Sequence, residues 1–397
     1  MKHLFVVLLS VVAVAGPAAA QSVEDVLREA DRLVAERQYD SAFEVLATSQ
    51  VSSTRVLAKQ IDIVTQYFVT SIMHQMFALT DLDSGQSLME LRRSGGSYQM
   101  RLFDPAAVAE PILQQQEAPE LAAALARYYD DALNRYGNDW VMPVEQVREK
   151  VVDYTRRAVA GGAGDQAPLS AAATYLLQAG DSAEAANLFA ASIELDADHA
   201  PAHYNYAIAL GQTGRAAEGI EHATRAAELY EYGQHQADSY VLLGQLHNAI
   251  DQSAEALASF EQAARTAPGY HYPHQFLVTE YLRRDNPDAA QQSAAVIIAA
   301  DPANPTAPQI VISLYNRAHA LEHLVTALAV IAVQYQGNAE AHGNVLFHLA
   351  EGHFRLGQFQ EGRRTLVEAR DEFRRVYDSD HPVFGEIERA LKETAES

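Results

Sequence analysis

A spacing of about 34 residues that recurs toward the C-terminus limits the fold more than any other feature of this sequence. In each copy a turn residue is followed by three recurring positions, five, nine and twelve residues later. Successive copies are 34, 37, 34, 34 and 38 residues apart. A period of this length indicates stacked helix–turn–helix units, which bury their apolar faces only against their neighbours. The copies span 180–195, 214–229, 251–266, 285–300, 319–334 and 357–372.

The three recurring positions of each copy lie on one face of a helix, because steps of three or four residues make about one turn. Most of them are small or apolar, so we expect them to form the core of the array. In chain order they are Ala185, Phe189, Ser192, Gly219, Ala223, Ala226, Ala256, Phe260, Ala263, Ala290, Ala294, Ile297, Leu324, Leu328, Ile331, Gly362, Leu366 and Ala369.

The pattern resembles the tetratricopeptide repeat (TPR) family. The residues that carry the resemblance are Gly244, Ala256, Phe260, Ala263 and Pro268 in one unit and Tyr281, Ala290, Asp301 and Pro302 in the next. The resemblance implies a right-handed α-solenoid whose concave groove is lined by the first helix of each unit. Such grooves usually bind peptides or partner proteins, although a fold alone does not identify a ligand.

The resemblance also implies which residues face the groove. Family members that hold a C-terminal carboxylate have Lys and Asn at two of these positions, and this chain has neither there, so we expect no such clamp. The polar groups present suit a peptide backbone, and Arg283 and Arg317 suit one acidic group. The predicted groove residues are Tyr204, Gln212, Gln245, Asn248, Gln275, Thr279, Arg283, Gln309, Ser313, Asn316 and Arg317.

The two ends of the array depart from the regular pattern. Residues 23–50 read as a divergent helical hairpin, in which Ala42 and Leu46 take the places of Ala185 and Phe189. At the other end, Pro382 opens a final helix to about residue 394. Its charged residues suit the cap that a repeat array needs on its exposed end.

Residues 1–20 read as a secretory signal: Lys2, an apolar run, then Ala18–Ala20 before Gln21. The apolar run is short for a membrane span. We therefore expect cleavage after Ala20 and a periplasmic or secreted protein of the exported bacterial type. The alternative is an uncleaved N-terminal anchor.

Residues 51–163 carry no repeat, and we expect a helical region of unclear fold. The pattern predicts a long helix over 56–78, a short extended segment over 98–103, a helix that starts at Asp104–Pro105, and helices over 119–136 and 143–160. The glycine-rich segment 160–164 reads as a linker. The expected parts are therefore a signal peptide (1–20), a hairpin (21–50), this region (51–163) and the array with its capping helix (164–397).

Composition excludes several classes of function. The formal net charge of −23 repels nucleic acid, and the absence of cysteine excludes disulfides and thiolate chemistry. His319 and His323, with Glu322, match the H-x-x-E-H pattern of some zinc proteases. However, His319 falls at a turn between helices, so the two histidines do not share a helical face. We expect no catalytic residue, no metal and no cofactor.

The sequence therefore predicts an all-α solenoid that serves as a non-enzymatic binding scaffold of the bacterial cell envelope. Its partner is expected to be a protein or peptide, with no nucleic acid and no stable membrane insertion after signal cleavage. Two alternatives stay open. One is a ligand-binding or enzymatic module in 51–163 that carries the array as an appendage, and the other is a purely architectural role.

Overall fold

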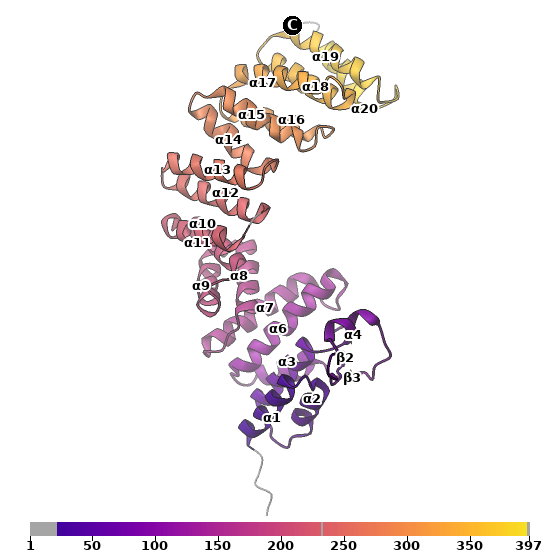
Figure 1. Cartoon of the computed structure of the whole chain (residues 1–397), viewed down its shortest axis with the longest axis vertical. Coiled ribbons are helices and arrows are strands. Elements are labelled where there is room, and N and C mark those ends of the chain that lie inside the picture. The colour runs from indigo at the N-terminus through magenta and orange to yellow at the C-terminus, as the bar shows by residue number, and fades with distance from the viewer. Residues whose placement is uncertain (1–21, 232, 395–397) are drawn as a thin grey trace, which may run out of the picture. The chain divides into compact units, whose positions relative to one another are not determined.

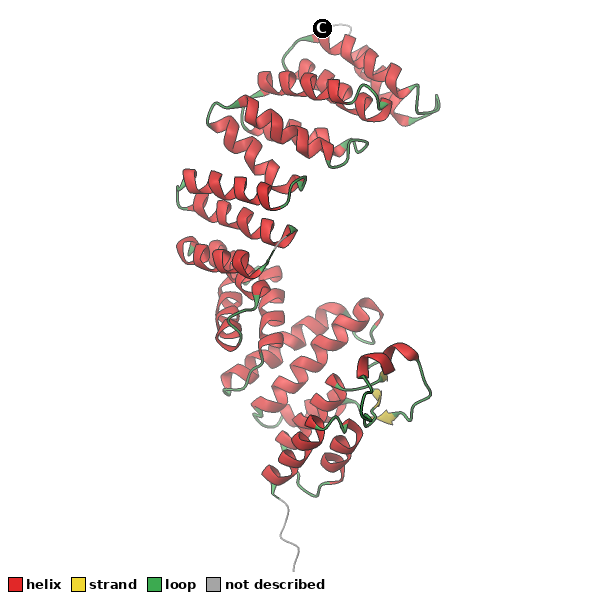
Figure 2. Ribbon diagram, in the orientation of Figure 1, coloured by secondary structure: helices red, strands yellow, loops and turns green. Residues whose placement is uncertain are grey.

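The computed structural model describes residues 22–231 and 233–394, so the predicted signal segment 1–20 lies outside the described residues. The chain divides into two compact units, Met1–Gly180 and Asp181–Ser397. Helices dominate both units, and the strands of the described residues lie together in the first one (Figures 1 and 2). That the glycine-rich segment 160–164 is a domain boundary stays a prediction.

The first unit joins a helical hairpin to a small sheet and a group of longer helices. The hairpin forms as predicted, from α1 and α2, and α5 begins directly after Asp104, whose carboxylate accepts a hydrogen bond from the Ala107 N–H at 3.1 Å. The elements are α1 (Val23–Ala35), α2 (Tyr39–Thr48), α3 (Thr54–Gln66), β1 (Thr70–Ile72), β2 (Met76–Ala78), α4 (Leu88–Ser94), β3 (Arg101–Leu102), α5 (Pro105–Leu113), α6 (Pro119–Tyr136), the 3₁₀ helix η1 (Gly137–Asp139), α7 (Val144–Ala160) and α8 (Gln166–Ala179).

The predicted long helix over 56–78 is wrong. Helix α3 ends at Gln66, and a β-hairpin follows in which Thr70 pairs with Ala78 and Ile72 with Met76. Strand β3 adds to β2 and completes an antiparallel sheet of order β1-β2-β3, which confirms the extended segment expected within 98–103. β-Branched and aromatic residues follow Gln66, and such residues favour strands once tertiary contacts are present.

Helix α6 forms the centre of the first unit and packs against α3, α5, α7 and α8. Its tyrosines Tyr128 and Tyr129 are fully buried. The Tyr129 hydroxyl donates to Glu110 of α5 at 2.6 Å, and the same carboxylate accepts from Lys150 of α7 at 2.5 Å. Buried polar groups need such partners, so Glu110 ties three helices together.

The second unit is a series of helix pairs. Four consecutive pairs run from α10 to α17, α18 and α19 form a further pair, and α20 closes the end at the predicted place. The elements are α9 (Ser182–Leu195), α10 (Ala200–Gln212), α11 (Ala216–Leu229), α12 (Gln234–Ala249), α13 (Ser253–Thr266), α14 (His271–Arg283), α15 (Pro287–Ala299), α16 (Thr306–Arg317), α17 (Leu321–Gln334), α18 (Ala339–Arg355), α19 (Phe359–Phe373) and α20 (Pro382–Glu393).

The sequence period is confirmed residue by residue. All eighteen recurring positions are buried. Each of the six turn residues has a left-handed backbone, with φ between 54° and 88°. Arg37, at the corresponding place in the N-terminal hairpin, has φ 64°. The turn residues of the array are Gly180, Gly214, Asp251, Asp285, His319 and Gly357.

The first helices of neighbouring pairs contact one another, in the series α10, α12, α14, α16 and α18. This row forms one face of the second unit. The two longer steps of the period lengthen helices of this row: α12 has 16 residues and α18 has 17, against 13 in α14 and 12 in α16. No helix of the described residues is both long and apolar enough to cross a membrane.

Candidate functional site

A hollow of about 560 Å³ lies on the row of first helices in the second unit. It is lined by side chains of α12, α14 and α16, and seven of the eleven predicted groove residues are among them. These seven are Asn248, Gln275, Thr279, Arg283, Gln309, Ser313 and Arg317; the remaining lining residues are Phe276, Glu280, Thr306, Ile310 and Leu314. We call this hollow the amide–arginine groove.

Two neighbouring helices present the same chemistry to the amide–arginine groove. Helix α14 carries Gln275, Thr279 and Arg283, and α16 carries Gln309, Ser313 and Arg317, each at intervals of four residues. Residues four apart lie on the same side of a helix. Each helix therefore offers a column of an amide, a hydroxyl and a guanidinium, and the two columns are 34 residues apart in sequence.

The hydroxyl groups of these columns act as acceptors toward a ligand. The Ser313 hydroxyl donates its proton to the Gln309 carbonyl at 2.9 Å, and Thr279 does the same to Gln275 at 3.5 Å. Their oxygen lone pairs stay available, while the amide of Gln309 can both donate and accept. An extended peptide backbone carries both kinds of group, so the columns match its hydrogen-bonding needs.

A buried carboxylate, Glu280, organises the positive end of the groove. Glu280 is 3 % exposed and accepts hydrogen bonds from Asn248 at 3.0 Å and from Arg283 at 2.8 Å. Arg284 also pairs with it. A buried charge is tolerated only when it is paired and hydrogen-bonded. The three partners satisfy Glu280, and Glu280 in turn holds Arg283 and Asn248 in place on the groove wall.

Glu280 is not among the predicted groove residues, but the sequence contains a signal for it. Aligning the repeats by their turn residues places Glu280 in the same column as Leu246 and Leu314, which are both buried. An acidic residue in an otherwise apolar column breaks the hydrophobic pattern. Such a break is expected at functional or strained sites.

Arg317 differs from Arg283 because it has no counter-ion. Within residues 22–231 and 233–394, no carboxylate pairs with the Arg317 guanidinium, and its side chain is exposed at the end of α16. An Arg guanidinium presents a planar fork of donors that fits a carboxylate or phosphate. Arg317 is therefore the group of the groove most ready to receive an anion.

The other four predicted groove residues lie outside this hollow. Tyr204 is half-buried against the apolar cluster of α10 and α12, and burial raises its pKa to about 12. Gln212 accepts a hydrogen bond from the Ser182 hydroxyl, and Gln245 interacts with Tyr272. Asn316 is exposed on α16 but does not line the hollow. The structure thus concentrates the predicted site on repeats three to five.

In the first unit, the β1–β2 hairpin makes an unusual turn. Its two central residues, Met73 and His74, both have left-handed backbones, with φ 51° and 57°. This type of turn normally contains Asn or Gly, because a Cβ atom makes positive φ costly. Two distant donors hold the turn: Trp140 Nε1–H binds the Met73 carbonyl at 2.9 Å, and the Tyr128 hydroxyl binds the His74 carbonyl at 3.2 Å.

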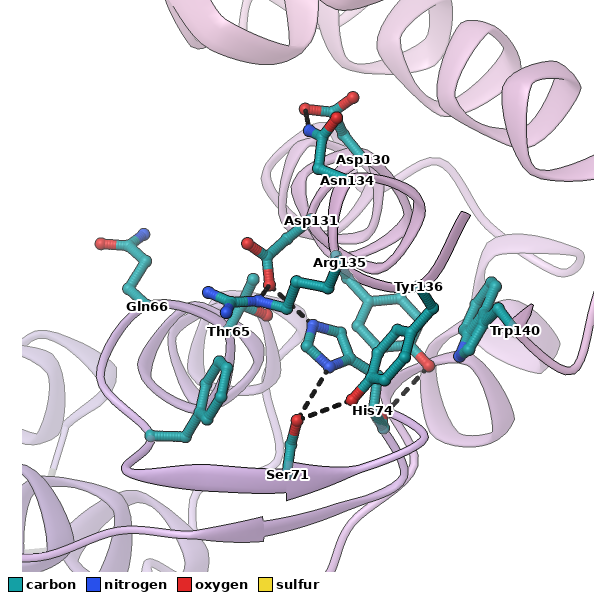
Figure 3. A network of polar contacts seen from close by, with 12 residues as sticks. Thr65, Gln66, Ser71, His74, Asp130, Asp131, Asn134, Arg135, Tyr136 and Trp140 are labelled. Carbon is teal, nitrogen blue, oxygen red and sulfur yellow. Dashed lines mark hydrogen bonds and ion pairs between the residues drawn. The ribbon is translucent and has the colours of Figure 1, made fainter. Parts of the chain in front are cut away.

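The His74 side chain forms a polar network with α6 (Figure 3). Its Nε2 lies 2.7 Å from Asp131 Oδ2, and its Nδ1 lies 3.3 Å from the Ser71 hydroxyl, which also contacts Tyr136 at 2.9 Å. A neutral ring with its proton on Nε2 satisfies both contacts. Burial raises the pKa of Asp131, but the bonds from His74 and Arg135 outweigh burial and lower it overall.

The network has the connectivity of a serine nucleophile, a histidine base and an orienting aspartate. However, His74 is 0 % exposed and is enclosed by the rings of Phe68, Phe77, Tyr128 and Tyr136. A substrate held at the surface does not reach this ring. We therefore interpret the network as a structural fastening between the hairpin and α6, and it gives no support to an enzymatic module in 51–163.

The two histidines of the protease-like pattern lie where the repeat register places them. His319 is the left-handed turn residue before α17, with φ 55°, and His323 is exposed on α17. The described residues contain no group of three or more His, Asp or Glu side chains arranged to hold a metal ion.

No protein-family model matches the chain, and no curated protein matches it. Solved helical-repeat structures do. YrrB, described as a TPR protein with an unusual peptide-binding site, is 18% identical and aligns over 45% of this chain and 89% of its own, with a TM-score of 0.32. A tetratricopeptide repeat protein from Parabacteroides merdae is 13% identical over 69% of this chain and 98% of its own, with a TM-score of 0.40.

Pseudomonas aeruginosa PilF is 15% identical over 56% of this chain and 96% of its own, with a TM-score of 0.38. Each TM-score is below 0.5 and each identity is below 25%, so these alignments carry no argument about what the chain binds or does. The helix pairs, five of the six left-handed turns and the eighteen buried positions define the second unit as a TPR-like helical array.

Proposed function

We propose that the chain is a non-enzymatic scaffold that binds an extended peptide segment of a partner protein in the amide–arginine groove. The observation that carries the proposal is the pair of equivalent columns on α14 and α16, which end in Arg283 and Arg317. The amide and hydroxyl groups bind the peptide backbone. The exposed Arg317 binds an acidic side chain, because an Arg–carboxylate pair combines the attraction of opposite charges with directed, bidentate hydrogen bonds.

The buried Glu280 supports this function, because it prepares the site before a ligand arrives. Its bonds to Asn248 and Arg283 restrict both side chains in the free protein. Ordering a flexible side chain on binding costs about 0.5–1.5 kcal/mol. A groove wall that is already held by Glu280 avoids part of that cost.

A randomised dodecapeptide library, displayed on phage and selected on the full chain, tests the proposal. Ser313→Tyr fills the middle of the groove, whereas Thr326→Tyr places the same ring at an exposed site on α17 outside it. We expect selected peptides to bind the Ser313→Tyr protein at least tenfold more weakly than wild type, and the Thr326→Tyr protein as well as wild type. If no peptide is selected, or both variants bind equally, the proposed function fails.

The location of this scaffold in the bacterial cell envelope is part of the proposal and derives from residues 1–20. Their charged start, apolar run and Ala18–Ala20 ending match a signal that is removed on export. N-terminal sequencing of the protein from fractionated cells tests this: a periplasmic chain that begins at Gln21 is expected. A cytoplasmic chain that begins at Met1 contradicts export.

A further inference from the structure

A second hollow of about 430 Å³ lies at the C-terminal end of the array. It is bordered by the start of α16, by one face of α18, by the end of α19 and by the start of α20. The lining residues that matter for its chemistry are Thr306, Gln309, Phe347, Glu351, Tyr377 and Glu386. We call it the aromatic–acidic hollow.

The two hollows share a wall. Thr306 and Gln309, on the first turn of α16, line both the amide–arginine groove and the aromatic–acidic hollow. Arg317 lies at the opposite end of the same helix. A ligand that follows α16 from Arg317 therefore passes Ser313 and Gln309 and enters the second hollow.

The charges of the two hollows are opposite. The amide–arginine groove contains two arginines and one carboxylate, Glu280, which is already paired. The lining of the aromatic–acidic hollow includes no lysine or arginine and two carboxylates, Glu351 and Glu386. Glu351 already pairs with Arg355 at 2.7 Å, so Glu386 is the carboxylate left for a ligand. Glu386 is exposed on α20, and among the described residues no cation pairs with it.

The floor of the aromatic–acidic hollow is held by buried polar contacts from α18. His348 Nε2 lies 3.1 Å from the Pro305 carbonyl, and Asn344 donates to the Ala303 carbonyl at 2.7 Å. His348 Nδ1 lies 3.2 Å from Glu351. This contact lowers the pKa of Glu351 to about 2, with Arg355 adding to the effect. Glu351 is therefore an anion at every physiological pH, and its position is fixed.

The walls are aromatic. Phe347 extends from α18, and the Tyr377 ring stacks on His381 with centroids 4.0 Å apart. Ring faces attract cations, and a carboxylate beside them adds to that attraction. A Lys or Arg side chain also has an aliphatic stem that packs on rings while its charged head stays at the rim. Aromatic walls beside the exposed carboxylate of Glu386 thus fit a basic side chain better than an acidic or a purely apolar one.

We propose that the aromatic–acidic hollow binds a lysine or arginine side chain of the same peptide whose acidic residue pairs with Arg317. This inference rests on the proposed function and adds an order and a spacing of charges to it. Gln309 and Arg317 are eight residues apart on one helix, which corresponds to about 12 Å. An extended chain advances about 3.3–3.6 Å per residue. The acidic and the basic residue of the ligand are therefore about three to four positions apart.

The peptides selected from the dodecapeptide library test this inference, together with two protein variants. Glu386→Arg reverses the charge of the hollow, and Glu388→Arg makes the same change at another exposed carboxylate of α20 that does not line the hollow. We expect the selected peptides to share an acidic and a basic residue at the stated spacing. Replacing the basic residue by glutamine is expected to weaken binding about three- to tenfold.

Measuring two peptides on two protein variants distinguishes a specific contact in the hollow from a general effect of charge. We expect Glu386→Arg to weaken the original peptide about three- to tenfold but to change the glutamine-substituted peptide less than twofold. Glu388→Arg is expected to change either peptide less than twofold. Peptides that bind at Ser313 but lack the basic residue, or that respond equally to both variants, overturn this inference and leave the proposed function standing. A library that yields no peptide sensitive to Ser313→Tyr overturns both.

Discussion

The turns of the array and the turn of the β1–β2 hairpin have the same left-handed backbone but are stabilised differently. After five of the six turn residues of the array, the next N–H bonds a carbonyl five residues back, as from Gln252 to His247 and from Ala320 to Tyr315, both at 2.9 Å. The carbonyls of Met73 and His74 are instead bound by Trp140 and Tyr128, 67 and 54 residues away.

This difference shows which residues stabilise the turns of each region. A turn of the array is determined within one helix end, so residues such as Asp285 and His319 tolerate positive φ through local bonds. The hairpin turn needs α6 and Trp140 to be in place before it is favourable. The array can thus fold one repeat at a time, whereas the hairpin depends on long-range contacts.

The largest effect is expected from a core truncation in each region. Phe260 and Phe77 are both buried, at 1 % and 0 % exposure, and replacing either by alanine should cost about 3–5 kcal/mol of unfolding free energy. In amide hydrogen exchange, Phe260→Ala should reduce protection mainly in α12–α15, because repeats contact only their neighbours. Phe77→Ala should reduce protection throughout the sheet and α6. Equal loss of protection in α12 and α20 after Phe260→Ala would break the comparison.

Removing the donor that holds the hairpin turn tests the second half of the comparison. Trp140→Phe keeps an aromatic side chain but removes the indole N–H and leaves the Met73 carbonyl without its partner, which should cost about 1–3 kcal/mol. Hydrogen exchange should show the loss at residues 70–78, while the second unit stays unchanged. Tyr128→Phe is the matched variant and should act at the same residues. Unchanged protection at 70–78 in both would show that the turn is stable without them.

Acid should weaken the end of the array through Glu351. Its folded-state pKa is lowered from 4.5 to about 2, so its stabilising effect is fully present above pH 4.5 and is lost as the pH falls toward 2. Because solvent screens this partly exposed group, we expect a loss of only about 1 kcal/mol. Denaturant unfolding at pH 5 and pH 2.5 measures it. Glu351→Gln should be less stable than wild type at pH 5, with the difference shrinking at pH 2.5; a constant difference would contradict the assignment.

The smallest effect is expected at the turn residues themselves. His319 has φ 55°, which costs a residue with a Cβ atom about 1 kcal/mol relative to glycine. His319→Gly should therefore raise the unfolding free energy by about 0.5–1 kcal/mol, and Gly357→Ala should lower it by about 1 kcal/mol. Thermal unfolding of the two variants measures both. A destabilising His319→Gly would indicate that the imidazole makes a contact that outweighs its backbone.

The sequence predicted the array well because its determinants recur and are local. The six turn positions and the eighteen buried positions could be identified by spacing alone. The region 56–78 could not, because Ile61, Val64 and Phe68 are also spaced as on a helix. The bonds to the Met73 and His74 carbonyls come from Trp140 and Tyr128, which are distant in sequence, so no local pattern includes them.

The candidate site was predictable in part. Seven of the eleven groove residues line one hollow: six form the two columns on α14 and α16, and Asn248 extends from α12 beside them. Glu280 was missed because hydrophobic periodicity assigns its position to the core, and only a comparison with Leu246 and Leu314 reveals the substitution. The aromatic–acidic hollow combines α16, α18 and α20, so its residues become neighbours only after the repeats stack.

The wall that Thr306 and Gln309 contribute to both hollows has a consequence for affinity. For a peptide that binds both hollows as proposed, the second charged residue meets its hollow at an effective concentration in the millimolar range, set by the length of chain between the two charges. Each contact alone is weak, but together they exceed either one without any new interaction. The effective concentration depends on the distance between the two charges. We therefore expect that distance to determine which partner binds, more than the identity of the residues between the charges.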